Sequence, residues 1–327
     1  MASQEPKKQK VDSSWGTDIS KKGEFKRKPS AFRNWITADG PFQPAAGRYH
    51  LYVSLACPWA HRTLIVRSMK GLAGAIGVTV VDWFLGDKGW SFTDKQPKTS
   101  LDTINNCNFL REVYQKANPE YSGRITVPVL WDKKLNTIVN NESSEIIRML
   151  NKEFNECAGS EEQRNLDLCP ESLLGKIDEV NSWIYELINN GVYKCGFARS
   201  QEAYDDAAQK LFAALDRVED ILSKSRYLCG DQLTEADIRL FTTLIRFDTV
   251  YVHHFKCNKK RIVDYPNLWG FTRDIYQTPG VKETVDQEHI QKHYQLSHTS
   301  INPLSIVAIG PDLDFDAPHG RDTQFQK

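Results

Sequence analysis

One segment constrains the fold of this chain more than any other, because it predicts a strand, a tight turn and a helix in direct succession. An apolar, β-favouring run over residues 49–55 is followed by Cys57 and Pro58, and apolar residues then recur at helical spacing over residues 58–70. Pro58 fits the first helical turn, where its missing N–H costs no hydrogen bond. Cys57 would then lie at a helix N-terminus, where free N–H groups and the positive end of the helix dipole favour an anion. We therefore expect the Cys57 thiol to have a lowered pKa and to react as a thiolate.

The neighbours of this cysteine bear on that expectation. His61 and Arg62 follow one turn later and add potential positive charge. The alternative is that Cys57 is a small apolar residue at a strand end, because buried cysteines are common in protein cores. Local sequence leaves both interpretations open.

Size and charge exclude several classes of protein. The chain of 327 residues suffices for two domains, at roughly 150 residues each. Lysine and arginine together number 42, as do aspartate and glutamate, so no net charge attracts nucleic acid or a membrane surface. No apolar stretch approaches the ~18 residues that span a bilayer, and the polar, lysine-rich N-terminus shows no secretory signal. We expect a cytoplasmic protein with no nucleic-acid or membrane partner.

Cysteine and histidine spacing argues against a metal site. The seven cysteines are scattered and form no CxxC pair, so we expect free thiols in a reducing compartment. Two histidine groups are spaced superficially like ligand sets but lack acidic or cysteine partners at matching spacing, and we expect solvated helix faces there. These groups are His289, His293 and His298, and His253, His254 and Cys257.

Composition shifts divide the chain into five parts. A polar N-terminal extension is expected to be ordered only where Trp15, Phe25, Phe32 and Trp35 dock, and the C-terminal tail is expected to wrap the surface. The parts are an extension over residues 1–46, an α/β domain over 47–152, a charged linker over 153–168, an all-helical domain over 169–297 and a tail over 298–327.

Periodicity predicts the elements within the two domains. The α/β domain should contain strands at 49–55, 77–84, 125–131 and 137–139 and helices at 58–70, 109–116 and 141–151. The helical domain should contain helices at 171–190, 202–223, 235–252, 266–277 and 279–286. Thr234 and Asp237 form a capping box before the third of these.

This layout resembles the glutathione transferase fold, an α/β thioredoxin-like N-terminal domain followed by an all-α C-terminal domain. Residues 57–60 (Cys-Pro-Trp-Ala) resemble the active-site motif of the cysteine-type members. Residues 124–130, with a Val-Pro pair, resemble the segment that holds the cis-proline of that fold, and residues 141–147 resemble the motif that binds the γ-glutamyl end of glutathione.

A narrower resemblance is to the xi class, the glutathionyl-hydroquinone reductases, and it covers residues 47–311. It is carried by Trp90, by residues 192–198 and 247–251, by His293-Tyr294 and by residues 300–303. The resemblance implies that Cys57 is the catalytic nucleophile and that Tyr193, Tyr251 and Tyr294 bind the quinol oxygens. It also implies a glutathione site made of Trp90, Arg124, Val127, Pro128, Glu142 and Ser143.

Each of these residues also has an ordinary structural interpretation. Glu142 and Ser143 suit the zwitterionic γ-glutamyl group, but they also suit a simple helix cap. Pro128 in a trans bond would fit an edge strand. Three tyrosines among twelve can be unrelated core residues.

The function implied by the resemblance is glutathione-dependent reduction of glutathionyl-hydroquinones through a mixed disulfide between Cys57 and glutathione. Position 60 is alanine rather than a second cysteine, which fits a route in which an external thiol resolves the disulfide. The alternatives are an omega-like enzyme that reduces dehydroascorbate or mixed disulfides, and a non-catalytic binding or assembly module of the same fold. Glutathione is expected as co-substrate, no metal is expected, and a homodimer is implied.

Overall fold

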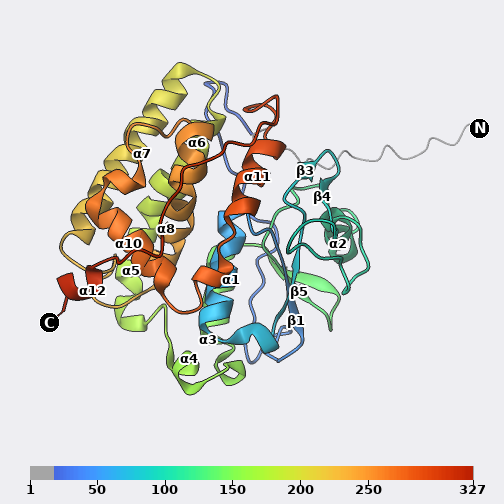
Figure 1. The fold of residues 1–327 in the computed structure, drawn as a ribbon. Helices are drawn as coiled ribbons and strands as arrows, with labels where there is room; N and C mark the ends of the chain where they lie inside the picture. Colours follow the sequence, from blue (N-terminus) through green and yellow to red (C-terminus); the bar gives the residue numbers. More distant parts are fainter. Residues whose placement is uncertain (1–17, 327) are drawn as a thin grey trace, which may run out of the picture.

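The computed structural model describes residues 18–326, and a four-stranded sheet of order β2-β1-β5-β6 forms its first half (Figure 1). β1 and β2 run parallel, whereas β5 lies antiparallel to both β1 and β6. Parallel neighbours need a crossover connection, and helix α1 supplies it. The strands are β1 (Tyr49–Val53), β2 (Gly77–Val80), β5 (Val129–Asp132) and β6 (Thr137–Asn140), and the crossover helix α1 is Pro58–Met69.

Helices cover both faces of the sheet. α1 packs against α3 (Ser143–Lys152) between the sheet and the helical half, and α2 (Leu110–Ala117) lies on the opposite side (Figure 1). All residues of β1 are buried, as expected for a central strand that is covered on both faces. A short hairpin of β3 (Leu85–Gly86) and β4 (Gly89–Trp90) follows β2. The predicted thioredoxin-like arrangement is thereby confirmed.

The second half is all helical, and the whole of α8 (Glu235–Arg246) is buried in it. α8 contacts α1 of the first half as well as α5 and α10 of its own, so it joins the two halves. The other helices are α4 (Glu161–Asn165), α5 (Leu174–Ile184), α6 (Gly191–Phe197), α7 (Gln201–Leu222), α9 (Val252–His254), α10 (Pro266–Gln277), α11 (Gln287–Ser297) and α12 (Arg321–Gln324).

Short turns of other helix types connect these elements. Two π-helical turns, Tyr185–Asn189 and Phe247–Tyr251, continue α5 and α8, so the helices predicted over 171–190 and 235–252 are each interrupted. The 3₁₀ turns are Leu72–Gly74, Asn155–Cys157, Glu171–Leu173, Ile262–Asp264 and Lys282–Thr284.

The start of α8 and the bounds of α10 are as predicted. Thr234 caps α8, and its backbone N–H donates to Asp237 Oδ2 at 2.8 Å, which confirms the capping box. Asp237 also accepts from the N–H of Leu228 at 2.8 Å, so one carboxylate fixes both the helix start and the loop before it.

Three predicted elements differ from the structure, and the first is the strand expected over residues 125–131, which begins only at Val129. The strand expected over residues 77–84 ends at Val80, because β2 is an edge strand and the chain turns after Val81 into the β3–β4 hairpin. The helix expected over 279–286 is only a 3₁₀ turn, and the true helix α11 begins one residue after that range. Asp286 caps α11 by accepting from the N–H of His289 at 2.8 Å, a start signal that the periodicity did not reveal.

The N-terminal extension packs on the protein from residue 18 onward. Phe25 and Ile36 are buried, and the N–H of Asn34 donates to Val139 of β6. Trp35 was expected to dock but is 43% exposed, and Trp15 lies outside the described residues. Within residues 18–326 the structure contains no helix with the length and apolarity required to cross a bilayer.

Candidate functional site

Cys57 occupies the N-cap position of α1, as the strand–turn–helix pattern predicts. Its Sγ lies 3.6 Å from the carbonyl oxygen of Val127, and the peptide bond between Val127 and Pro128 is cis. The thiol therefore faces the backbone of the residue before a cis-proline, which is the juxtaposition that the resemblance implied.

The expectation of a lowered thiol pKa is wrong for this conformation. Burial raises the pKa of Cys57, because the side chain is only 3% exposed and a thiolate would lose its hydration. Four groups oppose that effect: the backbone N–H groups of Ala60 and Trp59, and the charges of Arg246 and Arg27. The helix start and the nearby cations lower the pKa of the thiol, as expected, but the loss of hydration raises it by more.

His61 and Arg62 do not supply positive charge to the thiol in the expected way. Burial and the charge of Arg246 hold the pKa of His61 well below its usual value, so the ring is neutral. Arg62 is buried and turns away, with Nη1 donating to Ser143 Oγ at 3.3 Å and Nη2 to Asn189 Oδ1 at 2.9 Å.

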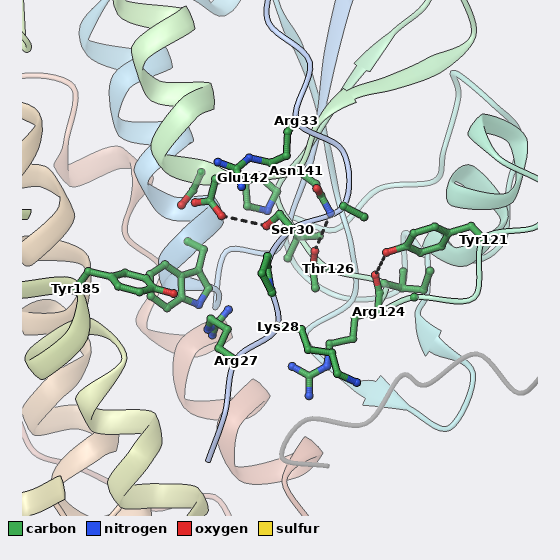
Figure 2. Close-up of a pocket in the computed structure, with 18 residues that line it drawn as sticks. Arg27, Lys28, Ser30, Arg33, Tyr121, Arg124, Thr126, Asn141, Glu142 and Tyr185 are labelled. Atoms are coloured by element: carbon green, nitrogen blue, oxygen red, sulfur yellow. Dashed lines mark hydrogen bonds between the residues drawn. The ribbon is translucent and has the colours of Figure 1, made fainter. Parts of the chain in front are cut away.

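A pocket of about 410 Å³ opens beside the thiol-bearing turn (Figure 2). Five of the six predicted glutathione-binding residues line it, namely Arg124, Val127, Pro128, Glu142 and Ser143. The lining comes from the N-terminal extension, from the segment before β5, from the start of α3, and from Trp59 and Tyr185. Its residues are Arg27, Lys28, Pro29, Ser30, Ala31, Arg33, Trp59, Tyr121, Gly123, Arg124, Ile125, Thr126, Val127, Pro128, Asn141, Glu142, Ser143 and Tyr185.

Glu142 is the principal negative group of this pocket. It caps α3, and its carboxylate accepts from the N–H and hydroxyl of Ser144 and from Ser30 Oγ at 3.0 Å (Figure 2). Burial raises the pKa of Glu142, but these hydrogen bonds and the charge of Arg62 outweigh it, and the pKa is lowered overall. The carboxylate is thus ionised and suited to an ammonium group, while Ser143 beside it offers a hydroxyl.

Arg124 lies at the other end of the pocket. Its Nη2 forms an ion pair of 3.1 Å with Asp18, and its carbonyl accepts from the hydroxyl of Tyr121 at 2.8 Å (Figure 2). A guanidinium in this position suits a carboxylate ligand at the opposite end from Glu142.

Trp90 is the one predicted glutathione-binding residue that the structure does not place in the pocket wall. It is buried, and its ring stacks on His293 with centroids 5.0 Å apart. Its indole Nε1 has no hydrogen-bond partner among the described residues. Burying a donor without a partner is costly, so this indole keeps a hydrogen bond available.

The three predicted tyrosines do converge. Their hydroxyls form two hydrogen bonds that meet at Tyr294. Tyr294 Oη lies 2.6 Å from Tyr193 Oη and 2.9 Å from Tyr251 Oη. The three residues come from α11, α6 and the second π-helical turn, respectively. Burial raises the pKa of Tyr193 to about 12 and raises those of Tyr251 and Tyr294 well above their usual value, so all three are protonated. We call these residues the tyrosine cluster. The cluster is closed to solvent, because all three side chains are buried and none of them lines the pocket.

The tyrosine cluster lies close to the thiol. The ring of Trp59, two residues after Cys57, has its centroid 6.2 Å from that of Tyr193, and a charge on Cys57 raises the pKa of Tyr193. Gly196 of α6 leaves room for the ring of Phe255, which packs on Tyr193, because a Cβ there would collide with that ring.

The expectation of solvated histidine faces is wrong. His254, His289, His293 and His298 are buried, and Cys257 with them. His254 Nε2 lies 3.1 Å from His298 Nδ1, and His293 Nδ1 donates to the carbonyl of Trp83 at 2.7 Å. Three of these rings contact Tyr294, which makes them the packing behind the tyrosine cluster. Within the described residues no group of three or more side chains is placed to hold a metal ion.

Sequence reasoning missed the contribution of the N-terminal extension. Arg27 lies over the ring of Trp59 at 4.4 Å and that of Tyr193 at 5.5 Å, and Phe25 packs against Tyr193 as well. Ser30 binds Glu142 directly. This extended segment has no periodicity, and the sequence signal it offers is a basic run flanked by Phe25 and Phe32.

Comparison with known proteins agrees with this geometry. The family models for the glutathione S-transferase N-terminal and C-terminal domains match residues 56–153 and 201–274. Glutathionyl-hydroquinone reductase YqjG of Escherichia coli is 56% identical over 319 residues, which cover 95% of this chain and 96% of that protein. Glutathione S-transferase omega-like 2 of Schizosaccharomyces pombe is 53% identical over 297 residues, 89% of this chain and 95% of that protein.

A solved structure extends the likeness to three dimensions. The xi glutathione S-transferase of Phanerochaete chrysosporium is 54% identical, covers 94% of this chain and 99% of its own, and superposes with a TM-score of 0.90. With its sheet half, its helical half and its cysteine beside a cis-proline, the chain belongs to the glutathione S-transferase family, and within that family to the xi class.

Proposed function

We propose that this protein is a glutathionyl-hydroquinone reductase that uses glutathione as co-substrate. The observation that carries the proposal is the position of Cys57, between a pocket that matches glutathione and a cluster of three protonated tyrosine hydroxyls. The name of the similar Escherichia coli protein supports the same reaction.

The glutathione pocket matches the charges of the tripeptide. The ionised Glu142 takes the γ-glutamyl ammonium, and the hydroxyl of Ser143 takes the carboxylate beside it. Arg124 takes the glycyl carboxylate at the other end. The backbone of Val127, before Pro128, pairs with the cysteinyl residue and brings the glutathione sulfur to Cys57.

The reaction proceeds in two thiol exchanges. The Cys57 thiolate attacks the sulfur of the glutathionyl-hydroquinone, a disulfide forms, and the carbon–sulfur bond breaks. Its electron pair passes to the ring carbon, which takes up a proton and becomes that of the free hydroquinone. A second glutathione then attacks the glutathione sulfur of the mixed disulfide, which releases oxidised glutathione and the Cys57 thiolate.

The tyrosine cluster acts on the quinol oxygens. Tyr193, Tyr251 and Tyr294 are protonated and donate hydrogen bonds to those oxygens. Such bonds stabilise the keto tautomer of the ring, in which the ring carbon is a better leaving group. Trp90, whose Nε1 lacks a partner, adds a donor beside the cluster.

Replacing the nucleophile tests this proposal. Cys57→Ser should lose glutathionyl-menadione cleavage by about 10³-fold or more, because a serine hydroxyl is not ionised at neutral pH. Cys157→Ser is the matched control, since Cys157 is a half-buried free thiol outside the site. Mass spectrometry should find glutathione on Cys57 of the wild type after incubation with glutathionyl-menadione in the absence of free glutathione. Full cleavage by Cys57→Ser would disprove the mechanism.

An omega-like activity is the second candidate, because a relative of 53% identity bears an omega-like name. That reading predicts faster turnover of dehydroascorbate or glutathionylated peptides than of glutathionyl-menadione, and competition between the two substrates in one assay decides. A non-catalytic module would show no glutathione on Cys57 under any of these conditions.

We also propose a homodimer in the cytoplasm. All seven cysteines are free thiols, which suits a reducing compartment. The exposed side chains of Leu304, Ile306 and Ile309 offer apolar surface for a second copy of the chain. Light scattering after size-exclusion chromatography should give twice the chain mass, and a monomer would refute the dimer.

A further inference from the structure

Arg246 is a fully buried cation at the last position of α8, and all its hydrogen bonds go to neutral groups. Its Nε donates to the carbonyl of Ala56 at 2.8 Å and its Nη2 to that of Leu55 at 3.1 Å. Its Nη1 donates to the carbonyl of Thr242 at 2.8 Å and reaches His61 Nδ1 at 3.0 Å. Among the described residues it has no carboxylate partner.

The hydrogen bonds around Arg246 fix the proton on His61. A guanidinium only donates, so His61 Nδ1 must accept from it, and the ring proton stands on Nε2. That proton is donated to Thr284 Oγ1 at 2.8 Å, whose own hydroxyl donates to the carbonyl of Val281 at 2.6 Å. His61 therefore stays neutral and cannot compensate the charge of Arg246.

A buried charge without a counter-charge is costly, and such charges are normally paired. Leu55 and Ala56 immediately precede Cys57, so the guanidinium is tied to the turn that carries the thiol. We infer that Arg246 is a positioning residue whose permanent charge takes the Cys57 thiolate as its counter-ion, while its two carbonyl contacts hold the thiol-bearing turn in place.

The charge of Arg246 also acts on groups of several other elements. It opposes the larger effect of burial, which raises the pKa values of Cys57, Tyr251 and Tyr294, and it adds to the effect of burial in lowering that of His293. Arg27 is the other cation that acts on the thiol, but it belongs to the N-terminal extension. Arg246 is thus the one fixed cation in the described residues whose charge acts both on Cys57 and on two members of the tyrosine cluster.

This inference rests on Cys57 being the nucleophile, but its test does not use the hydroquinone reaction. The rate at which iodoacetamide alkylates Cys57 is measured against pH, with peptide mass spectrometry to separate Cys57 from the other six thiols. The midpoint of that profile reports thiolate formation. The proposed function is tested separately, by cleavage of glutathionyl-menadione, so the two can fail independently.

Two substitutions separate charge from shape. Arg246→Gln keeps an amide donor but removes the charge, and it should raise the midpoint by about one pH unit, equivalent to a roughly tenfold slower reaction at neutral pH. Arg246→Lys keeps the charge and should recover more than half of that shift. A purely structural role would lower the melting temperature in both variants and leave the midpoint unchanged, and that result would overturn the inference.

A second pair of variants leaves Arg246 in place in case its replacement prevents folding. His61→Glu puts a carboxylate beside the guanidinium and should neutralise its effect, whereas His61→Gln is neutral and of similar size. The midpoint should be higher in His61→Glu than in His61→Gln. Equal midpoints, or a lower one in His61→Glu, would overturn the inference.

Discussion

The pocket that we propose for glutathione and the tyrosine cluster both lie close to Cys57 or its neighbour Trp59, yet they are built in opposite ways. The pocket is open, about 410 Å³ in volume, and most of its polar groups come from short segments of the first half and the N-terminal extension. The tyrosine cluster is closed, and its hydroxyls bond to one another among buried aromatic and histidine rings. The pocket is therefore formed before a ligand arrives, whereas the proposed role of the cluster requires it to exchange its internal hydrogen bonds for those of a substrate.

Acid should affect the cluster side most strongly. Burial lowers the pKa of both His254 and His293 to about 4, from the usual value of 6.5. These rings are neutral when folded, so they stabilise the fold fully above pH ~6.5, and that stability is lost as the pH falls towards 4. The loss should reach ~3 kcal/mol per ring.

Chemical denaturation between pH 7 and 4 measures this loss. His293→Gln can still donate to the carbonyl of Trp83 but cannot titrate, and it should flatten the profile. His319→Gln, outside the cluster, is the matched control. A steep profile that persists in His293→Gln would mean that acid acts elsewhere.

Removing one hydroxyl from the tyrosine cluster should lower the rate of cleavage without weakening the binding of glutathione in the pocket. Tyr294 bridges Tyr193 and Tyr251, so Tyr294→Phe breaks both hydrogen bonds at once. We expect kcat for glutathionyl-menadione to fall by about 100-fold with KM for glutathione unchanged. Tyr276→Phe, at a half-buried tyrosine packed on Phe315, is the control. A change confined to KM would contradict the division of roles.

The reverse pattern is expected on the pocket side. Glu142→Gln keeps the shape of the side chain and removes the charge that we propose binds the γ-glutamyl ammonium. KM for glutathione should rise by about tenfold, equivalent to ~1.4 kcal/mol, with kcat for the first thiol exchange unchanged. Steady-state kinetics at saturating glutathionyl-menadione measures both. A fall in kcat without a rise in KM would mean that the two regions are not separable.

The smallest expected effect concerns the N-terminal extension. Ser30→Ala removes one of the hydrogen bonds to the Glu142 carboxylate, the one at 3.0 Å. Because the bonds from Ser144 remain, KM for glutathione should change by only about two- to fivefold. Ser20→Ala, in the same extension but away from the pocket, is the control. An effect as large as that of Glu142→Gln would show that the extension dominates binding.

The sequence was sufficient for those parts of the site that depend on local patterns. The strand–turn–helix pattern located Cys57 at the start of α1, and the capping box located the start of α8. Both are short-range features, in which the residues that determine the structure are neighbours in the chain.

What the sequence could not show depends on contacts between distant segments. The pKa of Cys57 is raised by burial, and the position of the thiol at a helix start does not by itself reveal that desolvation. The histidines of α11 were expected on a solvent-exposed helix face. Trp83 and Trp90 pack against them, and that contact between distant segments cannot be read from the local sequence. The positions of Arg27 and Ser30 likewise follow from how an aperiodic segment crosses the surface.

The buried length of α8 has a consequence for how the protein can be divided. Its last residue, Arg246, supplies donors to the carbonyls of Leu55 and Ala56 in the other half. A sheet half expressed by itself would retain Cys57 but would leave those carbonyls without their partner. The two halves are therefore not interchangeable modules, and a chimaera between relatives would preserve thiol chemistry only if its helical half brought an arginine to this point.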